Sequence, residues 1–378
     1  MDNIVLSGVL AFAITFFSIP VIIQVAKNKK LFDEPDERKV HKIVIPTLGG
    51  LGIFAGFIIA TLMGTPSSAV GSLQYFAAAV LVIFFLGIKD DILILSASKK
   101  FIGQVLAAGI LIKFGGIQIT NMYGFLGIHE LPQFISIVLT LFTIVVITNS
   151  FNLIDGVDGL AGSLGLLTSS VFGFYFVQSG EILYAVMAFS LSGSLVAFLI
   201  YNFHPAKIFM GDTGSLLIGL LNSIFVIKFI SLAENAGGAL PIASAPAIGF
   251  AILIIPLFDT LRVVGLRILS RRSPFSPDRN HIHHLLLELG YCHKKVTIVC
   301  VSANILFIIL AYTLRFTGTT TVMLSLTAAA IVGVALVYYR RPKLKVVHLN
   351  TSVSKKSIIK THKIVNMVGE VVEHEPSF

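Results

Sequence analysis

The sequence predicts an all-α, polytopic integral membrane protein, and three observations carry that prediction. Of the 378 residues, 55% are hydrophobic and only 12% are charged, against about 25% charged residues in soluble proteins. Apolar runs long enough for a bilayer core of ~30 Å recur between charged or turn-forming segments. No pattern alternating polar and apolar residues over about ten positions recurs, which argues against a transmembrane barrel. We therefore expect a bundle of about 11 transmembrane helices.

The apolar runs follow one another at short intervals. Their approximate cores are residues 3–25, 49–63, 70–88, 101–119, 133–148, 159–178, 182–203, 214–232, 245–268, 296–314 and 321–339. Because a helix needs about 20 residues to span the core, the second and fifth runs are short for a crossing. We expect residues 1–345 to form one transmembrane domain. Residues 346–378 mix charged and polar types without a long apolar run, so we expect a cytosolic tail there, with disorder as one option.

Basic residues indicate the orientation of the bundle. Eleven crossings would place 25 of the 28 lysines and arginines on one side and only Lys113, Lys228 and Arg315 on the other. Cytoplasmic loops carry this excess, so the N-terminus is expected outside and the C-terminus in the cytoplasm, in the inner (plasma) membrane. The net charge of +9 then reflects topology and contact with anionic membrane lipids. No nucleic-acid partner is expected.

Acidic residues gather on the same predicted cytoplasmic side, although the charge rule gives them no reason to do so. Of the 19 acids, the outer side receives only Asp2, Glu130, Glu181 and Glu234. The cytoplasmic ends carry five polar stretches, namely "DEPDERKVHKIVIPTLGG" (33–50), "KDDILILSASKKFIGQ" (89–104), "NSFNLIDGVDGL" (149–160), "KIFMGDTGS" (207–215) and "SPDRNHIHHLLLELG" (276–290). Ionisable groups where helices enter or leave the membrane tend to face a cavity or one another, so we expect a functional site on the cytoplasmic face.

Two of these stretches suggest anion or metal chemistry. The adjacent carboxylates of Asp90 and Asp91 repel each other, and a divalent cation or a shared proton would relieve that repulsion. A solvated pair at the interface is the alternative. Asn149, Asn152 and Asp155 recur every three residues, so a last helical turn would align them on one face.

Three further features of the polar stretches allow two interpretations each. Asp212 precedes an apolar helix, where it would serve as an ordinary N-cap or would hold Mg²⁺ beside a phosphate at the helix N-terminus. Lys100 would anchor its helix at the interface or hold a phosphate. The histidines of "HIHH" suggest zinc at first sight, but nearby arginines would repel a cation, so an anion or nucleotide site is favoured.

Taken together, from about residue 27 to 295, the five stretches resemble the polyprenyl-phosphate N-acetylhexosamine-1-phosphate transferases of glycosyltransferase family 4, the group that contains WecA, TagO and MraY. "HIHH" after "SPDRN" is more similar to the WecA and TagO branch, although Leu285 stands where those relatives often carry an arginine. The resemblance implies transfer of a sugar 1-phosphate, N-acetylglucosamine 1-phosphate, from a UDP-sugar to undecaprenyl phosphate. The released product is UMP, and the lipid-linked diphosphate initiates synthesis of a cell-envelope glycan.

The resemblance also implies roles for individual residues and a cofactor. A catalytic role is implied for Asp90, Asp91, Asp155 and Asp158, and a metal-binding role for Asp212 with Asn152, the metal being Mg²⁺ with Mn²⁺ as a substitute. We assign substrate binding to Lys39, His41, Lys100, Asn149, Arg279, His281, His283 and His284. The expected partners are the UDP-sugar, undecaprenyl phosphate and membrane lipids, and a homodimer stays an open option.

A secondary transporter or channel is the alternative from another class. It predicts ionisable residues near the middle of the membrane and two repeated halves. Here the acids cluster at one interface and no internal duplication is visible. Asp259 is the acid closest to a buried position, and either pairing with Arg262 one turn later or contact with a metal or nucleotide would explain it.

Overall fold

The computed structural model describes residues 2–29, 45–93, 95–234, 242–273 and 280–340. The helices are α1 (Asp2–Lys29), α2 (Gly49–Gly64), α3 (Val70–Leu93), α4 (Ala97–Lys113), α5 (Gln133–Ile154), α6 (Leu160–Gln178), α7 (Ile182–Asn202), α8 (Gly211–Glu234), α9 (Ala245–Ile252), α10 (Ile254–Leu269), α11 (Ile282–Glu288), α12 (His293–Thr313) and α13 (Thr319–Tyr339), with a short 3₁₀ turn, η1 (Ser67–Ala69), before α3. Two strands, β1 (Asn121–Phe125) and β2 (Ile128–Glu130), form an antiparallel hairpin.

The predicted polytopic helical membrane protein is confirmed. Within the described ranges, eight helices are long and apolar enough to cross a bilayer, and the bent pair α9 and α10 would make a ninth. Helices α2 and α4, with 16 and 17 residues, are shorter, so the count of eleven crossings and the orientation of the termini stay predictions. The described residues lie within one compact unit, Met1–Arg341. The expected tail 346–378 lies outside the described residues.

Helix α8 occupies the centre of the bundle, and most of its side chains are buried. Helices α5, α3, α2 and α6 surround it, whereas α1 packs mainly against α7 and α2. Outer helices such as α1 and α13 expose large apolar side chains, Phe17 and Leu336 among them. A helix that is apolar all round suits either a protein core or lipid, so the same composition serves both places.

One predicted span is wrong in detail. The run 245–268 is two helices, α9 and α10, whose axes are bent by 87°. Pro256 has no N–H to donate to the carbonyl oxygen of Ile252 four residues earlier, so the helical ladder breaks there. Asn304 of α12 replaces the lost bonds: its Nδ2 donates to Ile252 O at 2.9 Å, and its Oδ1 accepts from Ile255 N at 3.3 Å.

A second difference lies between α4 and α5. The predicted helix 101–119 begins earlier, at Ala97, and ends at Lys113 before Gly115 and Gly116. Gly116 adopts a left-handed φ of 65°, a conformation that glycine reaches without steric cost. The β1–β2 hairpin follows, so the bundle is not purely helical. The hairpin is held by Tyr123, whose hydroxyl donates to Ile230 O at 2.6 Å.

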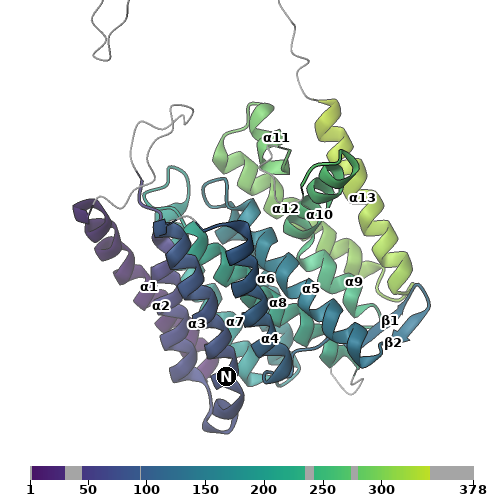
Figure 1. The fold of residues 1–378 in the computed structure, drawn as a ribbon, viewed down its shortest axis with the longest axis horizontal. Helices are drawn as coiled ribbons and strands as arrows, with labels where there is room; N and C mark the ends of the chain where they lie inside the picture. Colours follow the sequence, from purple (N-terminus) through teal and green to yellow (C-terminus); the bar gives the residue numbers. More distant parts are fainter. Residues whose placement is uncertain (1, 30–44, 94, 235–241, 274–279, 341–378) are drawn as a thin grey trace, which may run out of the picture. The chain divides into compact units, whose positions relative to one another are not determined.

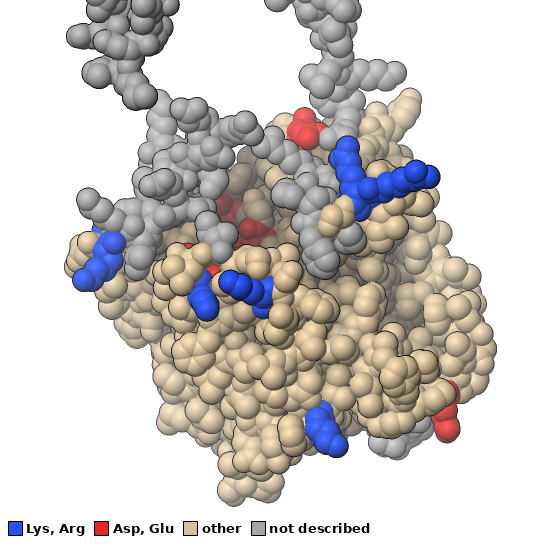
Figure 2. All heavy atoms as spheres, in the orientation of Figure 1, with Lys and Arg blue, Asp and Glu red and all other residues tan. Residues whose placement is uncertain are grey.

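Helix ends that carry the polar stretches meet at one end of the bundle. The carboxyl ends of α3, α5 and α7 lie beside the amino ends of α4, α6, α8 and α12, at the top of Figure 1. In Figure 2 this end is hollowed, with acidic side chains in the hollow and basic side chains around it. The alternation of helix direction therefore places residues far apart in sequence in one region.

Candidate functional site

Asp91 at the end of α3 caps the first turn of α8. One carboxylate oxygen accepts a hydrogen bond from Asp212 N at 2.7 Å, and the other accepts from Thr213 N at 3.1 Å and from Thr213 Oγ1 at 2.5 Å. The first amides of a helix lack partners within it, and a carboxylate also suits the positive end of the helix dipole. In this structure Asp91 thus positions Asp212.

Gly211 makes that close approach feasible. It adopts a left-handed φ of 72° directly before Asp212. A Cβ at this position would overlap the carbonyl oxygen of Thr47 and the Asp91 carboxylate. The glycine of "FMGDTGS" is therefore required twice, by its backbone conformation and by the space that the capping carboxylate occupies.

Lys100, in the first turns of α4, bridges two aspartates. Its Nζ donates to Asp212 Oδ2 at 2.7 Å and forms an ion pair with Asp90 Oδ2. The other oxygen of Asp90 accepts from Leu95 N at 2.5 Å, which ties the end of α3 to the chain leading into α4. The lysine is about three-quarters buried, so the ion pairs connect α3, α4 and α8 in a region of limited solvent access.

Asn152, near the end of α5, completes the surroundings of Asp212. Its Nδ2 donates to Asp212 Oδ1 at 2.9 Å and to Ser215 Oγ at 3.0 Å. Both oxygens of Asp212 therefore have protein partners, one from Lys100 and one from Asn152. The amide nitrogen of Asn152 faces Asp212. The role of Asn152 as a metal ligand therefore stays a prediction.

Asp155 follows α5 as its C-cap and differs from the other acids. Its electrostatic neighbours are the carboxylates of Asp212, Asp91 and Asp158. Burial, together with these like charges, raises the pKa of Asp155 well above its usual range. Within the described part of the chain, no cation or hydrogen-bond donor pairs with this carboxylate. Lys100 pairs with Asp90 and Asp212 but not with Asp155. Such an excess of oxygen donors and negative charge suits a hard divalent cation.

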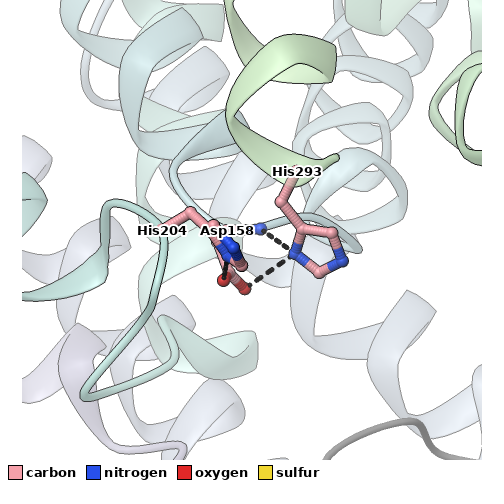
Figure 3. Close-up of side chains that lie close together, drawn as sticks. All are labelled: Asp158, His204 and His293. Atoms are coloured by element: carbon pink, nitrogen blue, oxygen red, sulfur yellow. Dashed lines mark hydrogen bonds and ion pairs between the residues drawn. The ribbon is translucent and has the colours of Figure 1, made fainter. Parts of the chain in front are cut away.

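Asp158, four residues into the turn and loop after α5, is held by two histidines (Figure 3). His204 Nδ1 lies 2.8 Å from Asp158 Oδ2, and His293 Nδ1 lies 3.1 Å from Asp158 Oδ1. Burial raises the pKa of Asp158, but the hydrogen bonds from His293 and His204 outweigh it, and the pKa falls to about 2. His204 precedes Pro205 in the segment between α7 and α8, and His293 is the first residue of α12.

Asp259 of α10 organises the histidine stretch. Its Oδ2 lies 2.9 Å from His281 Nδ1, and its Oδ1 accepts from Ile282 N at 3.0 Å, which caps the short helix α11. Arg262 one turn later binds Oδ1 at 2.7 Å and also donates to the Asn280 carbonyl oxygen. The local pairing expected for Asp259 is therefore present, and it also fixes the start of α11.

His283 lies against the loop that carries the aspartates. A Cβ at Gly156 would come within 2.6 Å of His283 Nε2, so the glycine leaves room for the imidazole. The side chain is buried, and burial lowers the pKa of His283 to about 3, so the ring is neutral near pH 7. The ring of His284 lies 4.3 Å from that of His283, centroid to centroid. The histidine stretch thus adjoins the aspartate cluster.

Asn149 is tied to a different partner. Its Nδ2 donates to Gln104 Oε1 at 2.7 Å, and Gln104 Nε2 donates back at 3.3 Å, which joins α4 to α5. Three assigned residues, Lys39, His41 and Arg279, lie outside the described residues. Sequence reasoning missed His204 and His293, because a single histidine beside a proline or at a helix start gives no distinctive pattern.

Comparison with known proteins decides the family. The profile described as glycosyl transferase family 4 matches residues 73–230. Decaprenyl-phosphate N-acetylglucosaminephosphotransferase of Mycobacterium leprae is 34% identical over 360 residues, which cover 89% of this chain and 90% of that protein. The chain belongs to glycosyl transferase family 4. This membership confirms the resemblance based on the five polar stretches.

Other relatives of this family 4 protein carry related names. The probable undecaprenyl-phosphate N-acetylglucosaminyl 1-phosphate transferase of Bacillus subtilis is 32% identical, over 83% of this chain and 87% of that protein. Undecaprenyl-phosphate alpha-N-acetylglucosaminyl 1-phosphate transferase of Escherichia coli K12 is 30% identical, over 73% of this chain and 74% of that protein. The profile match spans the aspartate cluster from Asp90 to Asp212, whereas the Mycobacterium leprae match, over 89% of the chain, is far longer.

Proposed function

We propose that this family 4 protein transfers N-acetylglucosamine 1-phosphate from its UDP derivative to a polyprenyl phosphate, undecaprenyl phosphate in particular. UMP leaves, and a lipid-linked diphosphate that initiates a cell-envelope glycan is formed. The observation that carries the proposal is the joining of Asp90, Lys100, Asn152 and Asp212 at one end of an apolar bundle. The names of relatives from three bacterial genera support the same sugar phosphate and the same class of acceptor.

Phosphoryl transfer between two anions depends on positioning and charge neutralisation more than on covalent help from the protein. Lys100 supplies a positive charge beside Asp212 and is the residue best placed to hold the acceptor phosphate. A phosphate monoester carries about −1.5 to −2 charge at pH 7, so it needs no base to become nucleophilic. We therefore favour direct attack by the lipid phosphate. A covalent aspartyl-phosphate on Asp90 or Asp91 is the competing mechanism.

Mg²⁺ fits the aspartate cluster, with Mn²⁺ as a substitute. Among the described residues, the carboxylate of Asp155 has no cationic partner and lies near the like charges of Asp212 and Asp91. Lys100 pairs with Asp212, so a further positive charge would stabilise the cluster. We assign Asp212 and Asp155 as its ligands, with Asn152 alongside. When bound, the ion would supply charge neutralisation at the diphosphate of the donor. Asp91 holds the chain at Asp212 in place through the helix cap, and Asp90 holds Lys100.

The histidine stretch would hold the nucleotide part of the donor. His281 Nε2 and His283 Nδ1 are buried and have no hydrogen-bond partner among the residues that the structure describes. Unsatisfied buried nitrogens carry a free-energy cost, and a polar ligand would remove it. The position of α11 beside Gly156 would bring such a ligand next to Asp155 and Asp212.

We place the site at the cytoplasmic face of the inner membrane. The basic side chains in Figure 2 gather mainly around the hollow that contains the acidic side chains, which is the distribution expected at a cytoplasmic surface. The acceptor has a membrane-buried tail, whereas the UDP-sugar is a soluble cytosolic molecule. A site at the ends of the helices serves both.

The test measures UMP release from purified protein given undecaprenyl phosphate, Mg²⁺ and a panel of UDP-sugars. We expect UDP-N-acetylglucosamine to be the best donor, with release dependent on the lipid phosphate. Asp212→Asn should lower the rate by about 100-fold or more, since it removes charge stabilisation of the transferring group. The matched control is Glu181→Gln, which makes the same change in an ion pair with Lys228 remote from the cluster and should keep full activity. Full activity of Asp212→Asn would contradict the proposal.

A further inference from the structure

A second group of ligand-type side chains lies next to the aspartate cluster and differs from it in chemistry. Asp158, His204 and His293 come from three segments: the loop after α5, the segment between α7 and α8, and the start of α12 (Figure 3). One donor atom from each lies within 4.8 Å of the others. Two imidazole nitrogens and one carboxylate oxygen are the ligands of many zinc sites, whereas Mg²⁺ prefers oxygen alone.

The distances agree with ligands around one ion. Zinc bonds of ~2.0–2.2 Å in a tetrahedron separate neighbouring ligand atoms by roughly 3.3 Å. His204 Nδ1 and His293 Nδ1 lie 2.8 and 3.1 Å from the two different oxygens of Asp158. One donor atom from each of the three residues lies within 4.8 Å of the others, so the side chains would have to draw closer around a bound ion. The rings of the two histidines lie 5.2 Å apart, centroid to centroid.

A purely hydrogen-bonded arrangement leaves a conflict at His293. The backbone N–H of Asp158 is directed at His293 Nδ1, at 3.4 Å, which requires a lone pair on that nitrogen. The Asp158 Oδ1 contact of 3.1 Å requires a proton on the same nitrogen. One Nδ1 atom does not meet both requirements. A cation between the lone pair of His293 and the carboxylate of Asp158 removes the conflict.

The surroundings hold the three side chains in place. Gly159 N donates to Asn202 Oδ1 at 2.9 Å, and Thr297 Oγ1 donates to the Asp158 carbonyl oxygen at 3.0 Å. These bonds fix the loop against α7 and α12 without any ion. Asp158 is buried, whereas the side chains of His204 and His293 are 34% and 25% exposed. The fourth coordination position would therefore face solvent, where a water molecule would complete the coordination of the ion.

We propose that Asp158, His204 and His293 bind a transition-metal ion, Zn²⁺ in particular, at a site separate from the Mg²⁺ site assigned to Asp212 and Asp155. The ion connects the loop that carries Asp155 to the segment preceding α8 and to α12. Nitrogen donors favour Zn²⁺ and Co²⁺ over Mg²⁺, so the two sites select different ions. The site does not depend on the identity of the sugar or lipid substrates.

The experiment uses the full-length protein in detergent, stripped with chelator and supplied with Co²⁺ or Zn²⁺ in the presence of excess Mg²⁺. We expect about one tightly held ion per chain and a visible Co²⁺ spectrum of low-coordinate nitrogen and oxygen ligation. His204→Ala and His293→Ala should each weaken binding by about 10-fold or more. Zn²⁺ should also raise the apparent melting temperature of the unmodified protein, because an ion that binds only the folded state stabilises it.

Two controls separate this site from others on the chain. His129→Ala removes an exposed histidine of the hairpin and should leave binding unchanged. Asp212→Asn should leave Zn²⁺ binding intact while it weakens Mg²⁺ binding. Loss of Zn²⁺ binding in His284→Ala with retention in His204→Ala would assign the ion to the histidine stretch and overturn the proposal. Absence of retained Zn²⁺ and Co²⁺ in the unmodified protein would overturn it even where a variant does not fold.

Discussion

Asp91 and Asp155 both present carboxylates to the same region, but their partners differ. Asp91 accepts three hydrogen bonds from the first turn of α8. Asp155 has only other carboxylates as electrostatic neighbours. A carboxylate that accepts hydrogen bonds within the protein helps to stabilise the fold. A carboxylate placed among like charges costs free energy in the folded protein, and a bound cation would remove that cost.

Asp155→Asn is therefore expected to separate activity from stability. Removal of a repulsive charge should leave the apparent melting temperature without Mg²⁺ unchanged or slightly higher. UMP release should fall by about 100-fold, in line with the loss of a group that stabilises the transferring phosphate. Melting curves and UMP assays on the same preparation check both parts. A lower melting temperature combined with full activity would show that Asp155 has a structural role only.

His283 gives a prediction about pH. Burial lowers its pKa to about 3, with His284, Asp259, His281 and His293 as its charged or titratable neighbours. Below the unfolded value of about 6.5, the unfolded chain binds a proton that the folded protein does not, so the free energy of unfolding falls as the pH falls. Between pH 6.5 and pH 5 the loss amounts to about 2 kcal/mol.

The check compares the unmodified protein with His283→Gln in thermal unfolding at pH 7 and pH 5. The melting temperature of the unmodified protein should fall more on acidification, because the variant lacks this group. Equal falls in both proteins would mean that His283 takes up its proton in the folded state.

At the level of elements, the bend between α9 and α10 shows how an interrupted helix is kept in a membrane bundle. Pro256 leaves Ile252 O without its helical donor, and Asn304 of α12 supplies one. In a membrane the freed backbone groups have no water to bind, so a partner within the protein is needed. The bend is therefore stabilised by Asn304, a residue from a distant part of the chain.

Asn304→Ala should therefore lower the free energy of unfolding by about 2 kcal/mol or more, since it leaves Ile252 O and Ile255 N buried without their partner. Asn222→Ala is the matched control. Asn222 is equally buried, and its partner among the described residues is Ile218 O in its own helix, where backbone bonds already exist. Unfolding in denaturant, followed for both variants, measures the difference. Similar losses in the two variants would contradict the role given to Asn304.

For the whole molecule, the alternating helices bring the ends of many elements, α3, α5, α7 and α8 among them, to one end of the bundle (Figure 1). That end carries the aspartate cluster, His204, His293 and the histidine stretch, and most of the basic side chains in Figure 2 surround it. We propose that it faces the cytoplasm. Cys292 at this end offers a thiol for chemical labelling, because it is exposed whereas Cys300 is buried.

A membrane-impermeant maleimide should therefore label Cys292 in inverted vesicles and not in intact cells. The comparison is His129→Cys in a Cys292→Ser background, since position 129 is exposed on the hairpin. It should show the reverse pattern. Labelling of Cys292 from outside intact cells would place the site on the other side of the membrane and contradict the expected orientation.

Much of this architecture was predictable from composition and pattern. Long apolar runs fix which segments become helices, because a backbone in hydrocarbon must satisfy its own hydrogen bonds. The order of those runs brings the polar stretches to one end, and their combination in one chain pointed to the family that the comparisons confirm. The bend within the predicted span 245–268 was not predicted, because period and length do not reveal a partner such as Asn304.

The sequence by itself determined the class of protein and the polar stretches that meet at one end of the bundle, since these follow from local polarity and from the order of the apolar runs. Only the tertiary structure decided which groups pair: Asp91 with the amides of α8, Lys100 with Asp90 and Asp212, and Asp158 with His204 and His293. Such pairings join segments up to 135 residues apart. They depend on how helices pack against one another, which the spacing of residues along the chain does not encode.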